Sequence, residues 1–409
     1  LDPSLRAISP SLLLSDHQGL IQSIDFDRDS SVMVSVGTEP APFQWPIAEL
    51  TNSRLAQSIA QNKPPKHIRV AATSDVISAL AVDPSGKYFA VADYANHFNV
   101  ASFAQPEALV KQWAFEDSSA VSIAWHPRST YVVAATLEPA SSIVFSPIGT
   151  APNNGLHRID MVQSIKSIAI DPLGKWLVVL DNDGLVSQIQ WSAIEATIAV
   201  PAQPPIKPIT SRGSRVTIIG ATVGNDGESA LITGGEDGEV TLWNLGVEPA
   251  LKSRQSIHAS QVTALAVSAR GLMGPIASGD DLGTIGVWRA DAAQAVAKLP
   301  VHRAAISSLD MSSDGRWLAA ASLDGEVTLW DLSRDELPMV RLTSSAGPAT
   351  FVRLDRSLRW LAVGHEQGLI ELWDLRHARL LVEESDKRPA HTPPKTLQPA
   401  ADEGNVPIT

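Results

Sequence analysis

One sequence motif of turn and strand residues occurs three times in this chain of 409 residues. It reads SLDGEVTLWDL at 322–332, GGEDGEVTLWNL at 234–245 and, more loosely, GHEQGLIELWDL at 364–375. A second phrase, in which a polar turn runs into an apolar strand, occurs as DPSGKYFAVAD, DPLGKWLVVLD, SSDGRWLAAAS and DRSLRWLAVG, beginning at 83, 171, 312 and 355. Such copies of one small unit indicate an architecture that is built by repetition.

Each unit predicts a meander of short antiparallel strands. A Gly in the polar turn can adopt the positive φ that closes a tight hairpin, and a short alternating strand such as AISSLDM at 305–311 precedes the turn. A further turn and a third strand follow. Eight units can be placed at a spacing of about 42–56 residues, close to the roughly 40–45 residues of a propeller blade. Their third strands are expected near Trp45, Val100, Phe145, Trp191, Trp243, Trp288, Trp330 and Trp373.

In these phrases the sequence resembles the WD40-repeat family, in the form found in bacterial WD40 arrays, over about residues 10–383. The resemblance implies an all-β fold, a closed WD40-like β-propeller of eight four-stranded blades, with seven as the alternative count. Such blades pack face to face around an axis because none can bury both of its faces alone. A strand near 11–15 or near 378–383 is then expected to complete the last blade and to join the two ends of the ring.

The family resemblance also implies a buried hydrogen-bond network within each unit. Its members are a His before the first strand, a Ser or Thr that ends the second strand, an Asp in the next turn and a Trp in the third strand. The seventh unit has all four as His302, Ser322, Asp324 and Trp330. We interpret these residues as a structural network and not as a nucleophilic triad, because each polar group would satisfy another.

Elsewhere the match to this network is partial. The sixth unit keeps His258, Ser278 and Trp288, whereas its Asp281 lies one residue out of register. The first four units lack most of these residues, so they are placed on their strand pattern alone. Three further tryptophans follow the hairpin turns at one repeated place and are interpreted as blade packing instead of a ligand cage: Trp176, Trp317 and Trp360.

Three segments do not read as blade strands. Residues 50–66 contain good helix formers and predict one or two helical turns, and the proline-rich stretch 201–208 predicts an extended surface connection. Residues 384–409 have little apolar content and predict a flexible Pro-rich tail or linker after a single propeller domain over 10–383. Since the chain begins at Leu1 without the pattern of a signal peptide, we expect a processed form or a part of a larger chain.

The composition excludes several classes of function. The absence of Cys excludes disulfides, thiolate metal sites and thiol nucleophiles. A net charge of -12 argues against nucleic acid as the main partner, because phosphate binding usually requires an excess of Lys and Arg. No apolar run approaches the roughly 20 residues that span a bilayer, so no membrane insertion is expected. The expected location is the cytoplasm, with the periplasm as the alternative.

The search for catalytic motifs identifies none. The sequence has no phosphate-binding loop and no nucleophile elbow, and HEQGL at 365–369 lacks the second His of a zinc protease. DNDG at 181–184 resembles the start of a calcium loop, but Ser192 stands where the closing Glu belongs. We therefore predict no catalytic residue, no metal and no cofactor.

The strand order predicts two unlike faces. The first rim consists of the turns between second and third strands and the approaches to the first strands; the second rim consists of the first-to-second-strand hairpins. Charged residues of the first rim are mostly acidic: Asp16, Glu39, Asp75, Asp93, Glu116, Asp117, Glu138, Asp181, Asp183, Glu236, Asp280, Asp281 and Glu366, against Arg212 and Arg303. The second rim has Arg28, Lys87, Arg128, Lys175, Arg270, Arg316, Arg356 and Arg359, mixed with turn acids.

This charge separation favours a protein partner with a basic segment on the first rim. The alternative is that Asp and Glu suit turns and solubility there. An aromatic ring, an imidazole and acids within 93–98 and 116–119 form the mixture expected of an anchor with a polar surround. The candidate partner-binding residues are Asp93, Tyr94, His97, Glu116, Asp117, Asp181, Glu236 and Asp280.

The sequence therefore predicts a non-enzymatic protein–protein interaction platform, which is a scaffold or sensor module of a larger bacterial assembly or signalling protein. The alternative is a periplasmic or envelope propeller domain of a membrane complex, and a third reading is a small-molecule hydrolase that uses the central channel. Carboxylates or histidines around a metal near the axis would favour the hydrolase, whereas a dry, apolar channel would favour the platform.

Overall fold

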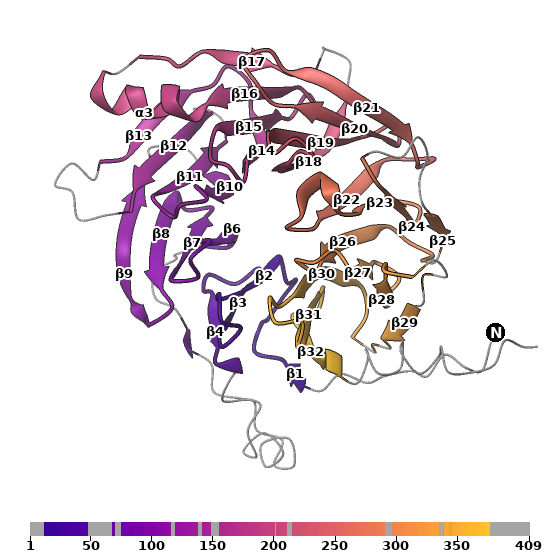
Figure 1. The fold of residues 1–409 in the computed structure, drawn as a ribbon. Helices are drawn as coiled ribbons and strands as arrows, with labels where there is room; N and C mark the ends of the chain where they lie inside the picture. Colours follow the sequence, from indigo (N-terminus) through magenta and orange to yellow (C-terminus); the bar gives the residue numbers. More distant parts are fainter. Residues whose placement is uncertain are drawn as a thin grey trace, which may run out of the picture.

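A computed structural model confirms the closed ring and the count of eight blades. It describes residues 12–47, 68–69, 75–115, 119–137, 141–148, 155–200, 202–210, 215–290, 297–300, 302–334, 337, 339–342, 344 and 346–376. In these residues the strands form eight four-stranded antiparallel sheets arranged in a ring around a central axis (Figure 1). Within each blade the innermost strand pairs with the second, the second with the third and the third with the outermost.

The blades are numbered in chain order. Blade 1 has β2 (Ser23–Phe26), β3 (Met33–Val36), β4 (Phe43–Trp45) and β5 (Ile68–Arg69); blade 2 has β6 (Ile77–Val82), β7 (Tyr88–Asp93), β8 (His97–Ser102) and β9 (Gln105–Ala114). Blade 3 has β10 (Ala120–Trp125), β11 (Tyr131–Thr136), β12 (Ser142–Pro147) and β13 (His157–Asp160); blade 4 has β14 (Ile165–Ile170), β15 (Trp176–Asp181), β16 (Val186–Gln190) and β17 (Ile206–Pro208), with the helix α3 (Trp191–Ala199) between its last two strands.

The second half of the ring repeats this order. Blade 5 has β18 (Val216–Val223), β19 (Ser229–Gly235), β20 (Glu239–Asn244) and β21 (Ala250–Ser256); blade 6 has β22 (Val262–Val267), β23 (Ile276–Asp280), β24 (Thr284–Trp288) and β25 (Ala297–Pro300), with the 3-10 helix η1 (Gly271–Met273). Blade 7 has β26 (Ile306–Met311), β27 (Trp317–Ser322), β28 (Val327–Asp331) and β29 (Met339–Leu342); blade 8 has β30 (Ala349–Leu354), β31 (Trp360–His365), β32 (Ile370–Asp374) and β1 (Leu12–Leu14).

The ring closes through blade 8, which takes its outermost strand from the other end of the chain. In β1, Leu12 lies opposite Leu372 and Leu14 lies opposite Ile370 of β32. This pairing confirms the predicted closure by residues 11–15, whereas 377–383 lie outside the described residues. Closure removes the free edge that β32 would otherwise expose.

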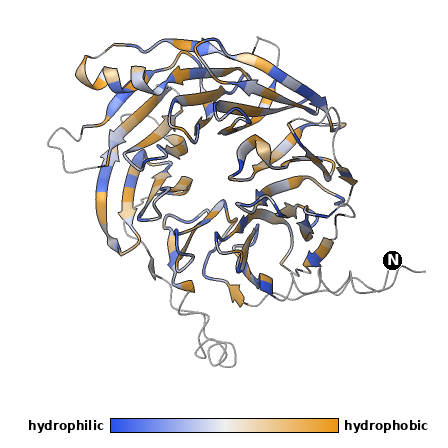
Figure 2. Ribbon diagram, in the orientation of Figure 1, coloured by the Kyte–Doolittle hydropathy of each residue, from blue (hydrophilic) through white to orange (hydrophobic). Residues whose placement is uncertain are grey.

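The hydrophobic core lies between the blades and not within them. Each of the eight clusters of buried apolar side chains joins two neighbouring blades. In β27, Trp317 packs toward blade 8 and Leu318 toward blade 6, as the alternation of side chains along a strand requires. The outermost strands are more hydrophilic, and β21 is largely exposed (Figure 2). No single blade can therefore bury its apolar faces without its neighbours.

A second kind of contact joins neighbouring blades near the axis. Seven innermost strands have a bulge in their pairing with the second strand, at the second residue of the innermost strand. In blades 5 to 8 the bulged residue is Ser or Thr, and its hydroxyl donates to a carbonyl of the next blade. These hydrogen bonds are Thr217 to Val262 O at 2.6 Å, Thr263 to Ile306 O at 2.6 Å, Ser307 to Ala349 O at 2.6 Å and Thr350 to Ile21 O at 2.7 Å.

The structure corrects two predictions about blade 4. Ile189, and not Trp191, occupies the place in the third strand that Trp330 holds in blade 7, because Ile189 lies opposite Leu177 as Trp330 lies opposite Leu318. Trp191 instead begins α3. The proline-rich stretch 201–208 does contribute a strand, because at an outer edge Pro208 needs no donor on its unpaired side. The predicted helical turns at 50–66 and the predicted tail at 384–409 lie outside the described residues.

Candidate functional site

The predicted network of blade 7 is buried, but its hydrogen bonds differ from the prediction. His302 Nε2 lies 3.1 Å from Thr328 Oγ1, and Trp330 Nε1 donates to the same hydroxyl at 3.1 Å. Asp324 lies 3.5 Å from His302 Nδ1. Ser322 does not bond to His302 or Trp330, since its hydroxyl donates to Ala304 O and accepts from the Asp324 N–H. The hydroxyl that links the His to the Trp therefore comes from the third strand in this blade.

In blade 6 the acid of the network is Asp280 and not Asp281. His258 Nε2 lies 2.7 Å from Ser278 Oγ, and His258 Nδ1 lies 3.0 Å from Asp280 Oδ2. Asp280 also accepts the N–H groups of Leu282 and Thr284, so the carboxylate closes the turn as well. Burial lowers the pKa of His258 and of His302 below the ordinary value, against the opposing effect of the neighbouring carboxylates. Both imidazoles are therefore neutral near pH 7.

Blade 1 contains a network that the sequence analysis missed. His17 Nε2 lies 2.6 Å from Ser35 Oγ, Trp45 Nε1 donates to the same hydroxyl at 2.8 Å, and Glu39 takes the place of the Asp beside His17 Nδ1. The prediction that the first four units lack most of these residues is thus wrong for blade 1. A His before the first strand and a Trp in the third were visible in the sequence, but the longer acid obscured the match.

Three of the candidate partner-binding acids are buried. Asp93 accepts the His97 N–H at 2.8 Å and lies 3.1 Å from His97 Nδ1, and Asp181 accepts the N–H groups of Asp183 and Leu185. Asp280 belongs to the network of blade 6. Asp93 and Asp280 are 0% exposed and Asp181 is 7% exposed. This corrects the assignment of these carboxylates to the surface: Asp suits such turns because its side chain accepts the N–H groups that a tight turn leaves unpaired.

The other candidates remain accessible or lie outside the described residues. Tyr94 is 50% exposed, and the side chain of His97 is 31% exposed. Glu236 is exposed and lies 3.4 Å from Arg215. Glu116 and Asp117 lie outside the described residues. The first rim thus offers an aromatic side chain and acids to a partner, with fewer free carboxylates than the sequence suggested.

Two exposed leucines of the first rim were not predicted. Leu282 is 59% exposed and Leu323 is 41% exposed, in the turns that follow the second strands of blades 6 and 7. The corresponding turns of blades 5 and 8 present Glu236 and Glu366. These four consecutive turns, which we call the leucine turns, thus present an exposed Leu in each of the two central blades and an exposed Glu in each of the two outer ones. The available signal was a Leu within a turn that is otherwise polar in the repeated phrase.

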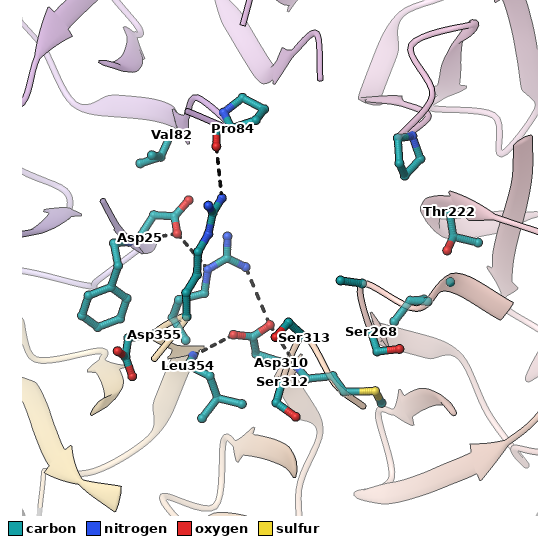
Figure 3. Close-up of a pocket in the computed structure, with 18 of the residues that line it drawn as sticks. Asp25, Val82, Pro84, Thr222, Ser268, Asp310, Ser312, Ser313, Leu354 and Asp355 are labelled. Carbon is teal, nitrogen blue, oxygen red and sulfur yellow. Dashed lines mark hydrogen bonds and ion pairs between the residues drawn. The ribbon is translucent and has the colours of Figure 1, made fainter. Parts of the chain in front are cut away.

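A polar cavity of about 650 Å³ lies where the central channel opens at the second rim. Figure 3 shows Asp25, Asp310 and Pro84 across the cavity from Thr222. Arg353 Nε donates to Asp25 at 3.0 Å, its guanidinium lies 3.8 Å from Asp310, and Arg356 donates to Pro84 O at 3.4 Å. The channel mouth thus presents charged side chains among apolar ones, and its described lining contains carboxylates without a histidine.

The carboxylates of this cavity are already bonded within the protein. Asp25 accepts the Phe26 N–H, and Asp310 accepts the N–H groups of Met311 and Leu354. Burial raises the pKa of Asp310, and the charge of Arg353 opposes this shift. The two acids raise the pKa of Arg353 in turn. This arrangement joins blades 7, 8 and 1 around one guanidinium, so it has a clear structural use at the ring closure.

A second cavity, of about 710 Å³, lies beneath α3 on the second rim. Its wall includes Trp191, whose ring centroid lies 4.7 Å from that of His126 and 5.5 Å from that of Tyr131. Trp191 Nε1 donates to Glu195 at 3.1 Å. Burial lowers the pKa of His126, so this imidazole is neutral near pH 7. Trp191 is packed by these rings, in a tilted contact with His126 and an edge-to-face contact with Tyr131, and it is only 4% exposed.

The described residues contain one group of side chains with the spacing of a metal site. Ligand atoms of His302, Asp324 and Glu326 lie within 4.8 Å of one another. Each is already engaged, because Thr328 lies on His302 Nε2, Arg303 N–H donates to Asp324 and Arg341 pairs with Glu326. Most of the atoms that could bind a cation thus have partners within the blade, and the group matches the structural network described above.

Comparison with known proteins supports the same family. The profile of the family described as "WD domain, G-beta repeat" matches residues 293–331, which include the first three strands of blade 7. No curated protein matches the chain. The crystal structure of the computationally designed Ika8 protein is similar in fold, with a TM-score of 0.68 at 16% identity, over 90% of this chain and 99% of Ika8.

The described helices are too short or too polar to cross a membrane. Propellers of the WD40 type generally act as scaffolds for protein interaction and are typically not enzymes. With eight blades of one plan, the His–hydroxyl–Trp networks of blades 1 and 7 and a matched repeat in blade 7, the chain is an eight-bladed β-propeller that contains a WD40 repeat.

Proposed function

We propose that this propeller is a non-enzymatic scaffold that binds a partner protein through its first rim. The leucine turns carry the proposal. Large apolar side chains that stay exposed on neighbouring blades, with charged residues around them, are typical of a protein-binding surface. Leu282 and Leu323 provide the apolar centre, and Glu236 and Glu366 provide the charged flanks.

The partner segment that fits this surface is amphipathic and basic. Its apolar side chains would cover the two leucines, and its Lys or Arg side chains would pair with the flanking glutamates. Such charge complementarity mainly raises the rate of encounter and the specificity for one partner over others. Tyr94 of blade 2 is a separate exposed anchor on the same rim, and it can contact a partner that extends across the channel.

The bonded state of the polar groups supports a role without catalysis. The carboxylates at the channel mouth are held by Arg353 and by backbone N–H groups, and the buried histidines serve the blade networks. We further propose that residues 10–383 form one domain, that 384–409 serve as a tail or linker, and that the ring is a sensor or scaffold module of a larger bacterial assembly.

Site-specific photocrosslinking tests the binding surface. A photoreactive residue replaces Leu282, Leu323 or, as a control on the outermost strand β21, the 49% exposed Leu251. We expect one partner to crosslink from both first-rim positions and not from position 251. Leu282→Ser with Leu323→Ser should then weaken binding of the purified partner at least tenfold without a change in thermal unfolding. Equal crosslinking from all three positions, or unchanged binding by the double variant, would refute the proposal.

A further inference from the structure

A third cavity lies on the second rim, between blades 6 and 7, on the face opposite the leucine turns. Its volume is about 420 Å³. Segments from two hairpins and from the ends of two third strands line it: Arg270, Met273, Gly274, Pro275, Arg289, Asp314, Gly315, Arg316, Leu332 and Ser333. The site therefore exists only where the two blades meet.

The lining concentrates positive charge in a protein whose net charge is -12. Arg270, Arg289 and Arg316 come from three separate segments, and Asp314 is the single carboxylate among the described lining residues. Arg316 is already neutralised, because its guanidinium donates to Asp331 at 2.8 and 3.1 Å and stacks over Trp317. Arg316 is thus held in place by Asp331 and Trp317. Arg270 and Arg289 are the cations that remain available to a ligand.

No ion pair joins Arg270 or Arg289 to a carboxylate of the described residues, although, against the effect of burial, the charge of Arg270 helps to lower the pKa of Asp314. Both side chains belong to exposed residues. Asp314 is turned to its own hairpin, where it accepts Ser312 Oγ–H and the Arg316 N–H. Two guanidinium groups with free donors beside one cavity are suited to a dianion, since each planar group can donate two parallel hydrogen bonds to phosphate oxygens.

Apolar groups complete the cavity. Met273 is 68% exposed at the tip of η1, and Pro275 and Leu332 lie in the same lining. A free phosphate ion would make no favourable contact with this apolar surface. A peptide side chain next to a phosphorylated residue would instead cover the flexible thioether of Met273. The combination of cationic and apolar groups therefore favours a phosphate that is carried by a peptide.

We propose that the cavity between blades 6 and 7 binds a phosphorylated peptide segment, with Arg270 and Arg289 on the phosphate monoester and Met273 under an apolar neighbour. The second rim then holds a phosphorylated protein while the first rim remains open to a basic partner. The site includes no residue of the leucine turns, so this proposal can be tested independently of the proposed first-rim surface.

Binding of defined peptides tests this site. The probes are a fluorescein-labelled peptide Ala-Ala-Leu-phosphoserine-Leu-Ala-Ala, the same peptide with Ser or Glu in the central place, and inorganic phosphate as competitor. Fluorescence anisotropy measures the affinity of the full chain for each. The variants are Arg270→Gln, Arg289→Gln and their combination, and Arg254→Gln is the control on the outermost strand β21, where Arg254 pairs with Glu239 at 3.2 Å.

The phosphopeptide should bind at least tenfold more tightly than the Ser peptide and more tightly than the Glu peptide. Each single Arg variant should lose about tenfold in affinity, as expected for a charge-assisted hydrogen bond to phosphate. The double variant should lose the preference for phosphate, and Arg254→Gln should bind as the unchanged protein does. Equal binding of the Ser and phosphoserine peptides, an unaffected double variant, or free phosphate that binds as tightly as the phosphopeptide would each overturn the proposal.

Discussion

Arg353 of β30 donates a hydrogen bond to Asp25 of β2 at 3.0 Å, although 328 positions of sequence separate the two residues. The same guanidinium lies 3.8 Å from Asp310 of β26. The first and last parts of the ring are thus joined at the axis by one side chain. The pairing of β1 with β32 closes blade 8 at its outer edge, so the ring is held shut both at the axis and at its periphery.

We predict that Arg353→Met destabilises the ring. The change leaves Asp25 and Asp310 without their shared cation, and a partly exposed pair of this kind is worth about 1–2 kcal/mol. Arg376→Met is the matched control, because Arg376 pairs with Asp374 at the periphery and its side chain is 61% exposed. Urea unfolding measures both. Equal stability of the two variants would show that the bond at the axis does not hold the ring.

The hydroxyls of the bulged residues give a second prediction. Thr263→Val and Thr350→Val keep the shape of the side chain but remove a donor that lies between carbonyls of two blades. Each change should lower the free energy of unfolding by about 1–2 kcal/mol, because a buried carbonyl loses its partner. Thr284→Val should cost much less, since the Thr284 hydroxyl has no hydrogen bond within the described residues. Chemical unfolding of the three variants distinguishes these outcomes.

Gly283 provides a test of the first-rim turns. Its φ is +86°, and a Cβ built there would lie 2.4 Å from His302 O. Gly283→Ala should therefore combine backbone strain with a collision and cost roughly 3 kcal/mol or more.

Gly227→Ala separates the two causes. Gly227 has a φ of +78° but no atom within 4 Å of the added Cβ, so only the backbone strain of about 1 kcal/mol is expected. Thermal unfolding compares the two variants. If both variants lose the same amount of stability, the close approach of Gly283 to His302 O does not contribute to the cost of the substitution.

The buried histidines predict how stability depends on pH. Burial lowers the pKa of His126, His258 and His302 below the ordinary value of 6.5, so the unfolded chain binds more protons than the folded ring in this range. Stability should be fully present above pH 6.5 and should fall as the pH decreases below it. Unfolding between pH 7.5 and 5.5 measures this slope.

His258→Gln checks the assignment. The amide cannot be protonated in this range, so the variant should be less stable at pH 7.5 but should show a smaller loss on acidification. A slope equal to that of the unchanged protein would show that His258 does not contribute to the pH dependence.

Local sequence was enough to predict the blades. The turn Gly and the apolar strand that follows it lie within about ten residues, so phrases such as SLDGEVTLWDL predict both a hairpin and its repetition. Blade 4 shows the limit of this method: Trp191 stood at a plausible distance, but only the pairing of Ile189 with Leu177 shows which residue occupies the third-strand place.

The candidate site was predicted only in part, because exposure is not a local property. Asp93, Asp181 and Asp280 have the same residue type and turn context as exposed acids. Their carboxylates are nevertheless buried and accept backbone N–H groups of their own turns. Conversely, Leu282 and Leu323 read as core residues by type, and the folded turns leave them in solvent.

The sequence by itself determined that this chain is a ring of repeated four-stranded sheets, because turn chemistry and the alternation of apolar residues act over a few positions. Only the tertiary structure decided which side chains come together from different blades: the Arg353 bond to Asp25, the hydroxyls that join neighbouring blades and the cavity that Arg270 and Arg289 of blade 6 line together with residues of blade 7. The physical reason is that each of these contacts depends on the packing of whole blades around the axis, which brings together residues that no local pattern connects.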